Sequence, residues 1–254
     1  MNIILIILVF GVIVFFHEFG HFIVAKMNKI AVMEFSIGMG PAIFSIQKKE
    51  TKYSLRLLPI GGYCMMMGED GESEDENAFN NKPLLARILV IAAGPVFNFI
   101  LAFVFSIVLI HFTGCDPARL TTVVEHSAAE DAGIVVGDTV TAINGKKIYN
   151  YREILLYMQA ENPSKPVTLS IEHADGSKES VVVTPKVDNE GNYKLGVAGG
   201  YVASTGFGND IKYAGLELRY WVKATVTGLR MIDCASVYQN ENRIGESIER
   251  VLKE

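Results

Sequence analysis

Two long apolar stretches limit what this chain can fold into. The first runs from Met1 to Ala25, and no charged residue occurs before His17. The second, residues 88–115, contains no Asp, Glu, Lys or Arg. Each stretch is long enough to cross about 30 Å of hydrocarbon as a helix that rises about 1.5 Å per residue. The sequence therefore predicts a membrane protein with α-helical spans at 1–26 and 83–113.

The first stretch also resembles a secretory signal peptide in its position and apolar character. It lacks a basic segment at its start, and no small-residue cleavage site follows a short apolar core. We therefore expect a retained transmembrane helix.

Composition excludes several classes of protein. Half of the 254 residues are hydrophobic, and apart from Glu18 the charges behind the net charge of −5 lie outside the two apolar stretches. No basic stripe is present, so no nucleic-acid partner is predicted. The three cysteines, at positions 64, 115 and 234, are odd in number and far apart, which indicates neither a disulfide framework nor a cysteine metal site.

The segment between the spans, 27–82, is polar and carries many Lys and Arg residues near the membrane ends. The positive-inside rule places it on the cytoplasmic side, so residues after 116 lie outside the cytoplasm. The segment begins with a turn-rich piece, FSIGMGP at 35–41, before the strand-like TKYSLRLLPIGGYCMMMGE. Its acidic run, GEDGESEDE at 68–76, lacks the spacing of an EF-hand loop, which favours a solvated loop.

Residues 116–200 read as a compact α+β domain. A helical turn begins at Ser127 and ends before Gly133, and the pair Asn144-Gly145 closes a strand. An amphipathic helix, YREILLYMQAE, and a hairpin around Asp175-Gly176 follow. The order of elements, with SAAEDAGIVVGD and AING, resembles a PDZ domain. That resemblance implies a module that accepts extended peptide ends by strand addition; a spacer without binding function is the alternative.

The last segment, 201–254, is predicted to begin as an amphipathic helix and to end in a polar tail, either helical or disordered. It contains charged residues throughout, and the sequence has no third apolar stretch of spanning length.

The first span carries an unusual polar cluster, in the sequence FFHEFGHFIVAK. His17 and His21 are four residues apart, so a helix places both on one face, where neutral imidazoles can bind Zn²⁺. Glu18 adjoins the first histidine and can act as a general base without ligating the metal; HExxH on a helix is the zinc metalloprotease arrangement. Ionisable groups in a span are costly, which favours a functional role. The alternative is a set of hydrogen bonds between helices. Gly20, between the two histidines, can admit a neighbouring segment or simply serve helix packing.

These motifs together resemble the site-2 protease family, in its bacterial regulator-of-sigma-E type. The resemblance rests on HEFGH, FSIGMGP, LPIGGYCMMMGE, AFNNKPLLARILVIAAGPVFNFILA and the PDZ-like domain, which occur in the order of that family. It implies a multi-pass protease of the bacterial inner membrane that cleaves transmembrane segments of single-span proteins. Expected substrates are anti-sigma factors or signal-peptide remnants.

The resemblance also implies site residues. His17 and His21 match the family's zinc ligands, and Glu18 matches its catalytic base. LPIGGYCMMMGE, which contains Gly61 and Gly62, resembles a membrane-dipping β-loop that pairs with an unwound substrate strand. Asn98 is expected near the active site, where it can hold the substrate backbone; a hydrogen bond between helices is the alternative. Gly94-Pro95 belongs to the same family motif or is a simple helix kink.

The sequence departs from the family in one respect. The family's third zinc ligand, an aspartate in an LDG motif of a later span, has no counterpart here. We therefore expect a copy of the protease that lacks its C-terminal spans. The alternative function is that of a catalytically inactive, membrane-anchored PDZ protein that binds peptide ends.

Overall fold

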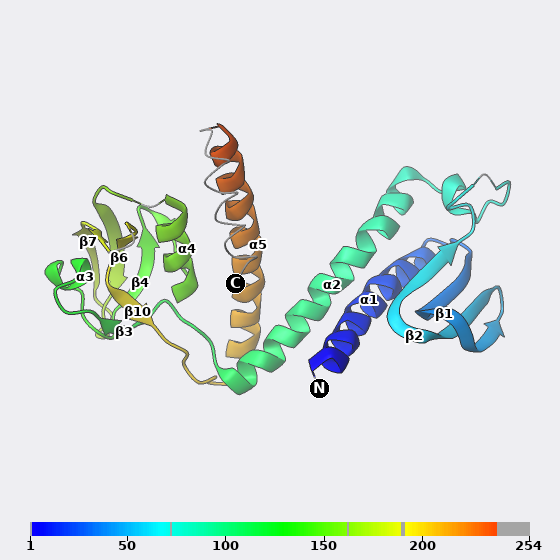
Figure 1. The fold of residues 1–254 in the computed structure, drawn as a ribbon, viewed down its shortest axis with the longest axis horizontal. Helices are drawn as coiled ribbons and strands as arrows, with labels where there is room; N and C mark the ends of the chain where they lie inside the picture. Colours follow the sequence, from blue (N-terminus) through cyan, green and yellow to red (C-terminus); the bar gives the residue numbers. More distant parts are fainter. Residues whose placement is uncertain (1, 72, 162, 189–190, 238–254) are drawn as a thin grey trace. The chain divides into compact units, whose positions relative to one another are not determined.

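A computed structural model describes residues 2–71, 73–161, 163–188 and 191–237 (Figure 1). The chain forms two compact units, Met1–Phe105 and Ser106–Glu254, and each is considered by itself. The predicted polar tail after residue 237 lies outside the described residues. The boundary between the units falls within a helix, at residue 105, whereas the sequence placed a boundary after that helix, at 113.

Helices occupy both apolar stretches. α1 runs over Asn2–Met27 and α2 over Leu84–Thr113, with Pro95 inside α2. Among the described residues, these two helices are long and apolar enough to span a membrane. Only 6% of the first span and 22% of the second is buried within the protein. Their apolar side chains therefore face outward, as expected for surfaces in contact with lipid.

A long antiparallel hairpin joins the two helices in the first unit. β1 covers Val32–Lys48 and β2 covers Thr51–Met66, and a short 3-10 helix, Phe79–Asn81, precedes α2. The hairpin turns at Lys49, whose φ of 55° is left-handed. Its outer half exposes large apolar side chains: Ile37, Met39, Ile43, Phe44, Ile46, Leu55, Leu57, Leu58 and Ile60. An apolar surface of this kind supports the predicted contact with the bilayer.

The turn predicted for FSIGMGP is wrong, because these residues lie inside β1. Gly38 and Gly40 both have a φ of 84°, and the β1–β2 register shifts at this point, where Met39 faces Leu58 and Ala42 faces Arg56. Glycine permits the left-handed conformation that bulges require. The glycines therefore bend the strand and do not end it.

The base of the hairpin packs against α1. Buried side chains from the helix, the hairpin and α2 form one cluster: Ala25, Ile30, Val32, Phe35, Cys64, Met66 and Val90. Aromatic rings surround it, and Phe22 and Phe35 lie 4.9 Å apart between ring centroids. This packing holds β2 beside the part of α1 that carries the histidines.

The second unit contains small antiparallel sheets around one core. Its four-stranded sheet has the order β5-β4-β6-β7, with strands Lys146–Lys147, Thr139–Ile143, Val167–Glu172 and Lys178–Val183. β3 (Leu120–Val123) pairs with β10 (Val197–Gly199), and β8 (Lys186–Val187) pairs with β9 (Tyr193–Lys194). The helices are α3 (Ala128–Asp131), α4 (Tyr151–Glu161) and α5 (Phe207–Val237).

Local signals predicted in this unit are confirmed. Ser127 caps α3 by accepting a hydrogen bond from the backbone N–H of Glu130, and Gly133 follows with a φ of 81°. Asn144 and Gly145 both have positive φ, as a tight hairpin turn between β4 and β5 requires. The hairpin between β6 and β7 also lies where it was predicted.

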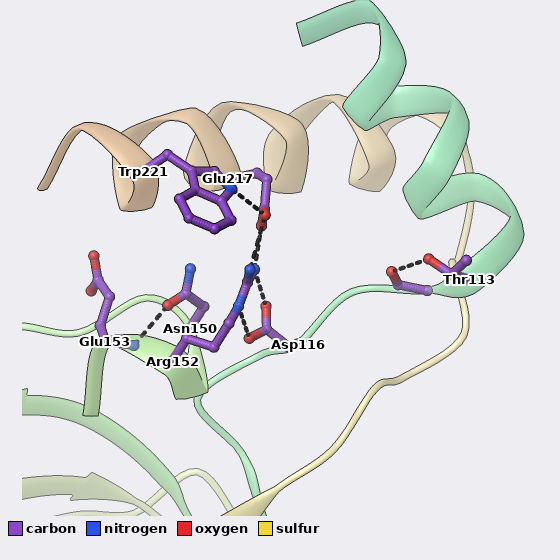
Figure 2. Close-up of polar contacts among 8 residues, drawn as sticks. Thr113, Asp116, Asn150, Arg152, Glu153, Glu217 and Trp221 are labelled. Carbon is purple, nitrogen blue, oxygen red and sulfur yellow. Dashed lines mark hydrogen bonds and ion pairs between the residues drawn. The ribbon is translucent and has the colours of Figure 1, made fainter. Parts of the chain in front are cut away.

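Buried charges attach α5 to α4, as Figure 2 shows. Arg152 donates to Asp116 over 2.8 Å and also to Glu217 of α5. Glu153 is fully buried and accepts from Arg219 over 2.5 Å. Removing one partner of a buried ion pair leaves an uncompensated charge, which costs about 3–5 kcal/mol. The network therefore fixes the angle at which α5 leaves the sheets.

We predict that residues 118–200 fold as an isolated domain, because the core of the second unit lies between Ala118 and Leu195. A dispersed amide spectrum of this fragment by NMR is the expected result. A collapsed spectrum typical of an unfolded chain would contradict the prediction.

A pH dependence is also expected in this domain. A hydrogen bond of 2.8 Å to the buried Asp138 raises the pKa of His173 above its ordinary value of 6.5. The interaction of protonated His173 with Asp138 therefore stabilises the folded domain fully below pH 6.5. This contribution to the free energy of unfolding is lost as the pH rises through the folded-state pKa of His173. Thermal unfolding of wild type and His173→Gln should therefore differ at pH 6, and the difference should shrink by pH 9. A constant difference would argue against this linkage.

Candidate metal centre

The two histidines of α1 point the same way. His17 and His21 are one turn apart on the helix, and their ring centroids lie 4.8 Å apart at an interplanar angle of 77°. The spacing predicted from the sequence is thus realised by an unbroken helix.

α1 and α2 approach each other closely beside these rings. A β-carbon on Gly20 would lie 2.6 Å from the backbone oxygen of Ala93, nearer than side-chain atoms can approach. Gly20 therefore lies where α1 and α2 approach closely, which agrees with both interpretations given for it. Its missing side chain lets the α2 backbone reach the histidine-bearing turn of α1.

Gly94 provides the matching space on α2. A β-carbon there would lie 2.5 Å from Nε2 of His21 and 2.6 Å from Nε2 of His17. Both Nε2 atoms therefore lie against Gly94 on α2, closer than any side chain at that position would allow. Sequence reasoning saw a possible kink at this position and missed this role, because the signal is the absence of a side chain opposite another helix.

The remaining ring nitrogens have partners on α2. Nδ1 of His21 lies 2.7 Å from the backbone oxygen of Val90, and Nδ1 of His17 lies 3.1 Å from Nδ2 of Asn98. Zinc-binding histidines commonly engage their second nitrogen with a carbonyl or carboxylate in this way. These contacts at Nδ1 fix the orientation of both rings and leave their Nε2 atoms available as metal ligands.

This donor set fits zinc. Neutral imidazole is a preferred Zn²⁺ ligand, and two converging Nε2 atoms offer two positions of a tetrahedral site. Within the part of the chain that the structure describes, no group of three or more His, Cys, Asp or Glu side chains is arranged to hold a metal. His17 and His21 are therefore the two ligands that can be named.

Glu18 faces the hairpin. It borders a cavity of about 490 Å³ together with His21, and the cavity is lined mainly by β2 and the loop that follows it. The lining residues include Tyr63, Cys64, Met65, Met66, Glu69 and Asp70. The carboxylate thus lies beside the metal ligands and next to a space that can admit solvent or substrate.

The two glycines predicted to bind substrate lie on β2 near this region. A β-carbon on Gly62 would lie 3.6 Å from Cγ of Glu18 and 2.7 Å from the backbone oxygen of Ser36. Gly61 borders a second, largely apolar groove of about 490 Å³ between α1 and the hairpin. The structure therefore brings Gly62 to the catalytic turn and Gly61 to an adjacent apolar surface.

Comparisons with known proteins agree with this chemistry. The family model described as peptidase family M50 matches residues 5–246. A provisionally named zinc metalloprotease of Clostridium acetobutylicum is 35% identical over 231 residues, which cover 91% of this chain and 68% of that protein. The regulator of sigma-W protease RasP of Bacillus subtilis is 28% identical, over 88% of this chain and 72% of its own length.

Solved structures match about a third of this chain. The PDZ domain of an SdrC-like protein from Listeria innocua is 19% identical, with a TM-score of 0.30. The match covers 34% of this chain and 97% of that domain. Scores this low carry no conclusion about function.

We predict that Gly94→Ala weakens zinc binding at least roughly tenfold, about 1.4 kcal/mol, because both ligand nitrogens would have to move. Gly215→Ala is the matched control, since a β-carbon at that helical position meets no atom within 4 Å. Zinc affinity measured by competition with a chelator tests this. Equal affinities of the two variants would contradict the proposed position of the site.

Proposed function

This chain belongs to peptidase family M50, and from that premise we propose that it serves as an intramembrane zinc metalloprotease that cleaves transmembrane segments of single-span proteins. The finer points of this function, meaning the substrate, the cutting site and the membrane orientation, are part of the proposal.

One observation carries the proposal. Nε2 of His17 and Nε2 of His21 both lie beside Gly94, and Glu18 and His21 border a cavity beside β2. A metal site inside an apolar helix explains why such costly groups occur there.

The chemistry divides between the metal and the chain. Zinc supplies Lewis acidity, which polarises a carbonyl group and makes water more acidic. His17 and His21 would hold it, and the carboxylate of Glu18 would take a proton from the attacking water and pass it to the leaving amine nitrogen.

The hairpin supplies the surface for the substrate. The groove bordered by Gly61 also contains Ile4, Leu8, Val12 and Phe15 of α1, and its walls are mostly apolar. These walls suit an apolar segment. Pairing with an edge of the hairpin would hold that segment extended, which exposes the peptide bonds that a helix hides. The register shifts within β1 and β2 leave part of the ladder irregular at this level.

The proposal extends to the substrates of the protein and to its location in the cell. The Bacillus subtilis relative is named as a regulator of sigma-W, which favours anti-sigma factors as substrates, with signal-peptide remnants as the second class. Proteins of this family are membrane proteins, and we place the hairpin on the cytoplasmic side of a bacterial inner membrane and the second unit on the outer side.

A second candidate function has an observation of its own. A groove of about 560 Å³ lies between α4 and residues 193–197, with Leu155 and Met158 on one side and Leu195 and Val197 on the other. It has the dimensions of a small-ligand or peptide site. This favours peptide binding by the second unit, either in support of cleavage or as the chain's entire activity.

We predict that Glu18→Gln lowers cleavage of a single-span substrate by about 10²–10⁴-fold, because it removes the proton acceptor. Zinc content should not change, since Glu18 is not a ligand. Cleavage is measured in proteoliposomes and zinc by elemental analysis. Glu50→Gln, which alters an exposed glutamate at the tip of the hairpin, is the control with unchanged turnover.

Two results would overturn the proposed cleavage. Turnover that persists in Glu18→Gln would mean that another group accepts the proton. A wild-type protein that binds zinc and captures peptides in the second groove without cutting any substrate would establish the binding function in place of the protease.

A further inference from the structure

We infer that Asn98 is a positioning residue for the metal centre: its side-chain carbonyl accepts a hydrogen bond from Nδ1–H of His17 and thereby keeps Nε2 of that ring free to bind zinc. The inference rests on the proposed function, and it gives Asn98 a task different from the substrate binding that its place in the sequence suggests.

His21 shows the arrangement that a ligand needs. Its Nδ1 lies 2.7 Å from the backbone oxygen of Val90. A carbonyl oxygen can only accept, so Nδ1 carries the proton and Nε2 keeps its lone pair. The α2 backbone thus fixes the tautomer of this histidine before any metal arrives.

His17 has a side-chain amide in the equivalent place. Nδ1 of His17 lies 3.1 Å from Nδ2 of Asn98, and the other amide atom, Oδ1, is buried without a hydrogen-bond partner among the described residues. In that orientation the amide donates, so Nδ1 must accept. The ring proton would then lie on Nε2, where it blocks metal binding.

A half-turn of the amide exchanges its two atoms and reverses the hydrogen bond. Oδ1 then takes the position beside Nδ1 of His17, and His17 adopts the same tautomer as His21. The unpaired Oδ1 means that the first orientation satisfies only one end of the buried amide among the described residues. Zinc binding would favour the reversed orientation, because it needs a free lone pair on Nε2 of His17, which lies with Nε2 of His21 beside Gly94.

The spacing between Gly94 and Asn98 on α2 matches the two nitrogens of the His17 ring. Gly94 and Asn98 are one turn apart on α2, so the same helix face offers an open space to Nε2 and a hydrogen-bonding group to Nδ1. Such partners behind a ligand typically contribute about 10–100-fold to metal affinity.

Zinc affinity of three variants tests the inference. Asn98→Leu keeps the size of the side chain but cannot accept, and its affinity should fall about 10–100-fold. Asn98→Asp keeps an acceptor for Nδ1–H, and its affinity should remain within about threefold of wild type or increase. Val96→Ala, at a side chain of α2 that is 51% exposed, is the control without effect. The rescue by aspartate separates positioning from simple packing.

The tautomer gives a second readout. Nitrogen-15 NMR of histidine in the zinc-loaded protein should show a proton on Nδ1 of His17 and none on Nε2. This measurement does not depend on cleavage, and it applies to wild type and to Asn98→Asp if the leucine variant fails to fold.

The outcomes are separable. Zinc binding that Asn98→Leu leaves unchanged, or a proton on Nε2 of His17, would overturn the inference while the proposed protease stands. Loss of turnover in Asn98→Leu with unchanged zinc affinity would return Asn98 to substrate binding. A wild-type protein that binds no zinc would overturn the metal centre and this inference together.

Discussion

The close approach of two helix backbones is the constraint on which the first unit depends. Gly20 on α1 admits the backbone of α2, and Gly94 on α2 leaves room for two imidazole nitrogens. Neither glycine contributes a contact of its own; each permits one. Packing through small residues is common between helices in membranes, where no hydrophobic effect drives association. Here the same packing also brings the Nε2 atoms of His17 and His21 together beside Gly94, where we propose that they bind zinc.

The hairpin and the second unit extend this centre in different ways. β2 lies beside the turn of α1 that carries Glu18, so the proposed general base borders a cavity. In the second unit, ion pairs between α4 and α5, one of them to the buried Glu153, join a long helix to a small domain that has a groove of its own. Each unit therefore offers an apolar groove with the dimensions of a peptide segment, and the first also holds the residues proposed for hydrolysis.

The sequence predicted the local features well, because they depend on neighbouring residues. The helical spacing of His17 and His21, the cap at Ser127 and the turn at Asn144 all follow from short-range geometry. The turn expected at FSIGMGP failed because glycines with positive φ also form bulges inside a strand, and only the partner strand decides between the two. The tasks of Gly94 and Val90 were out of reach for the same reason. Gly94 acts through its missing side chain, and Val90 acts through its backbone oxygen. Both effects depend on how α2 packs against α1.

X-ray absorption at the zinc edge tests the central claim most directly. Zinc-loaded protein should show nitrogen neighbours at about 2.0–2.1 Å with the outer scattering of imidazole rings. That imidazole contribution should be lost when His17 and His21 are both replaced by alanine. A spectrum that the double replacement leaves unchanged would place the metal elsewhere and contradict the account.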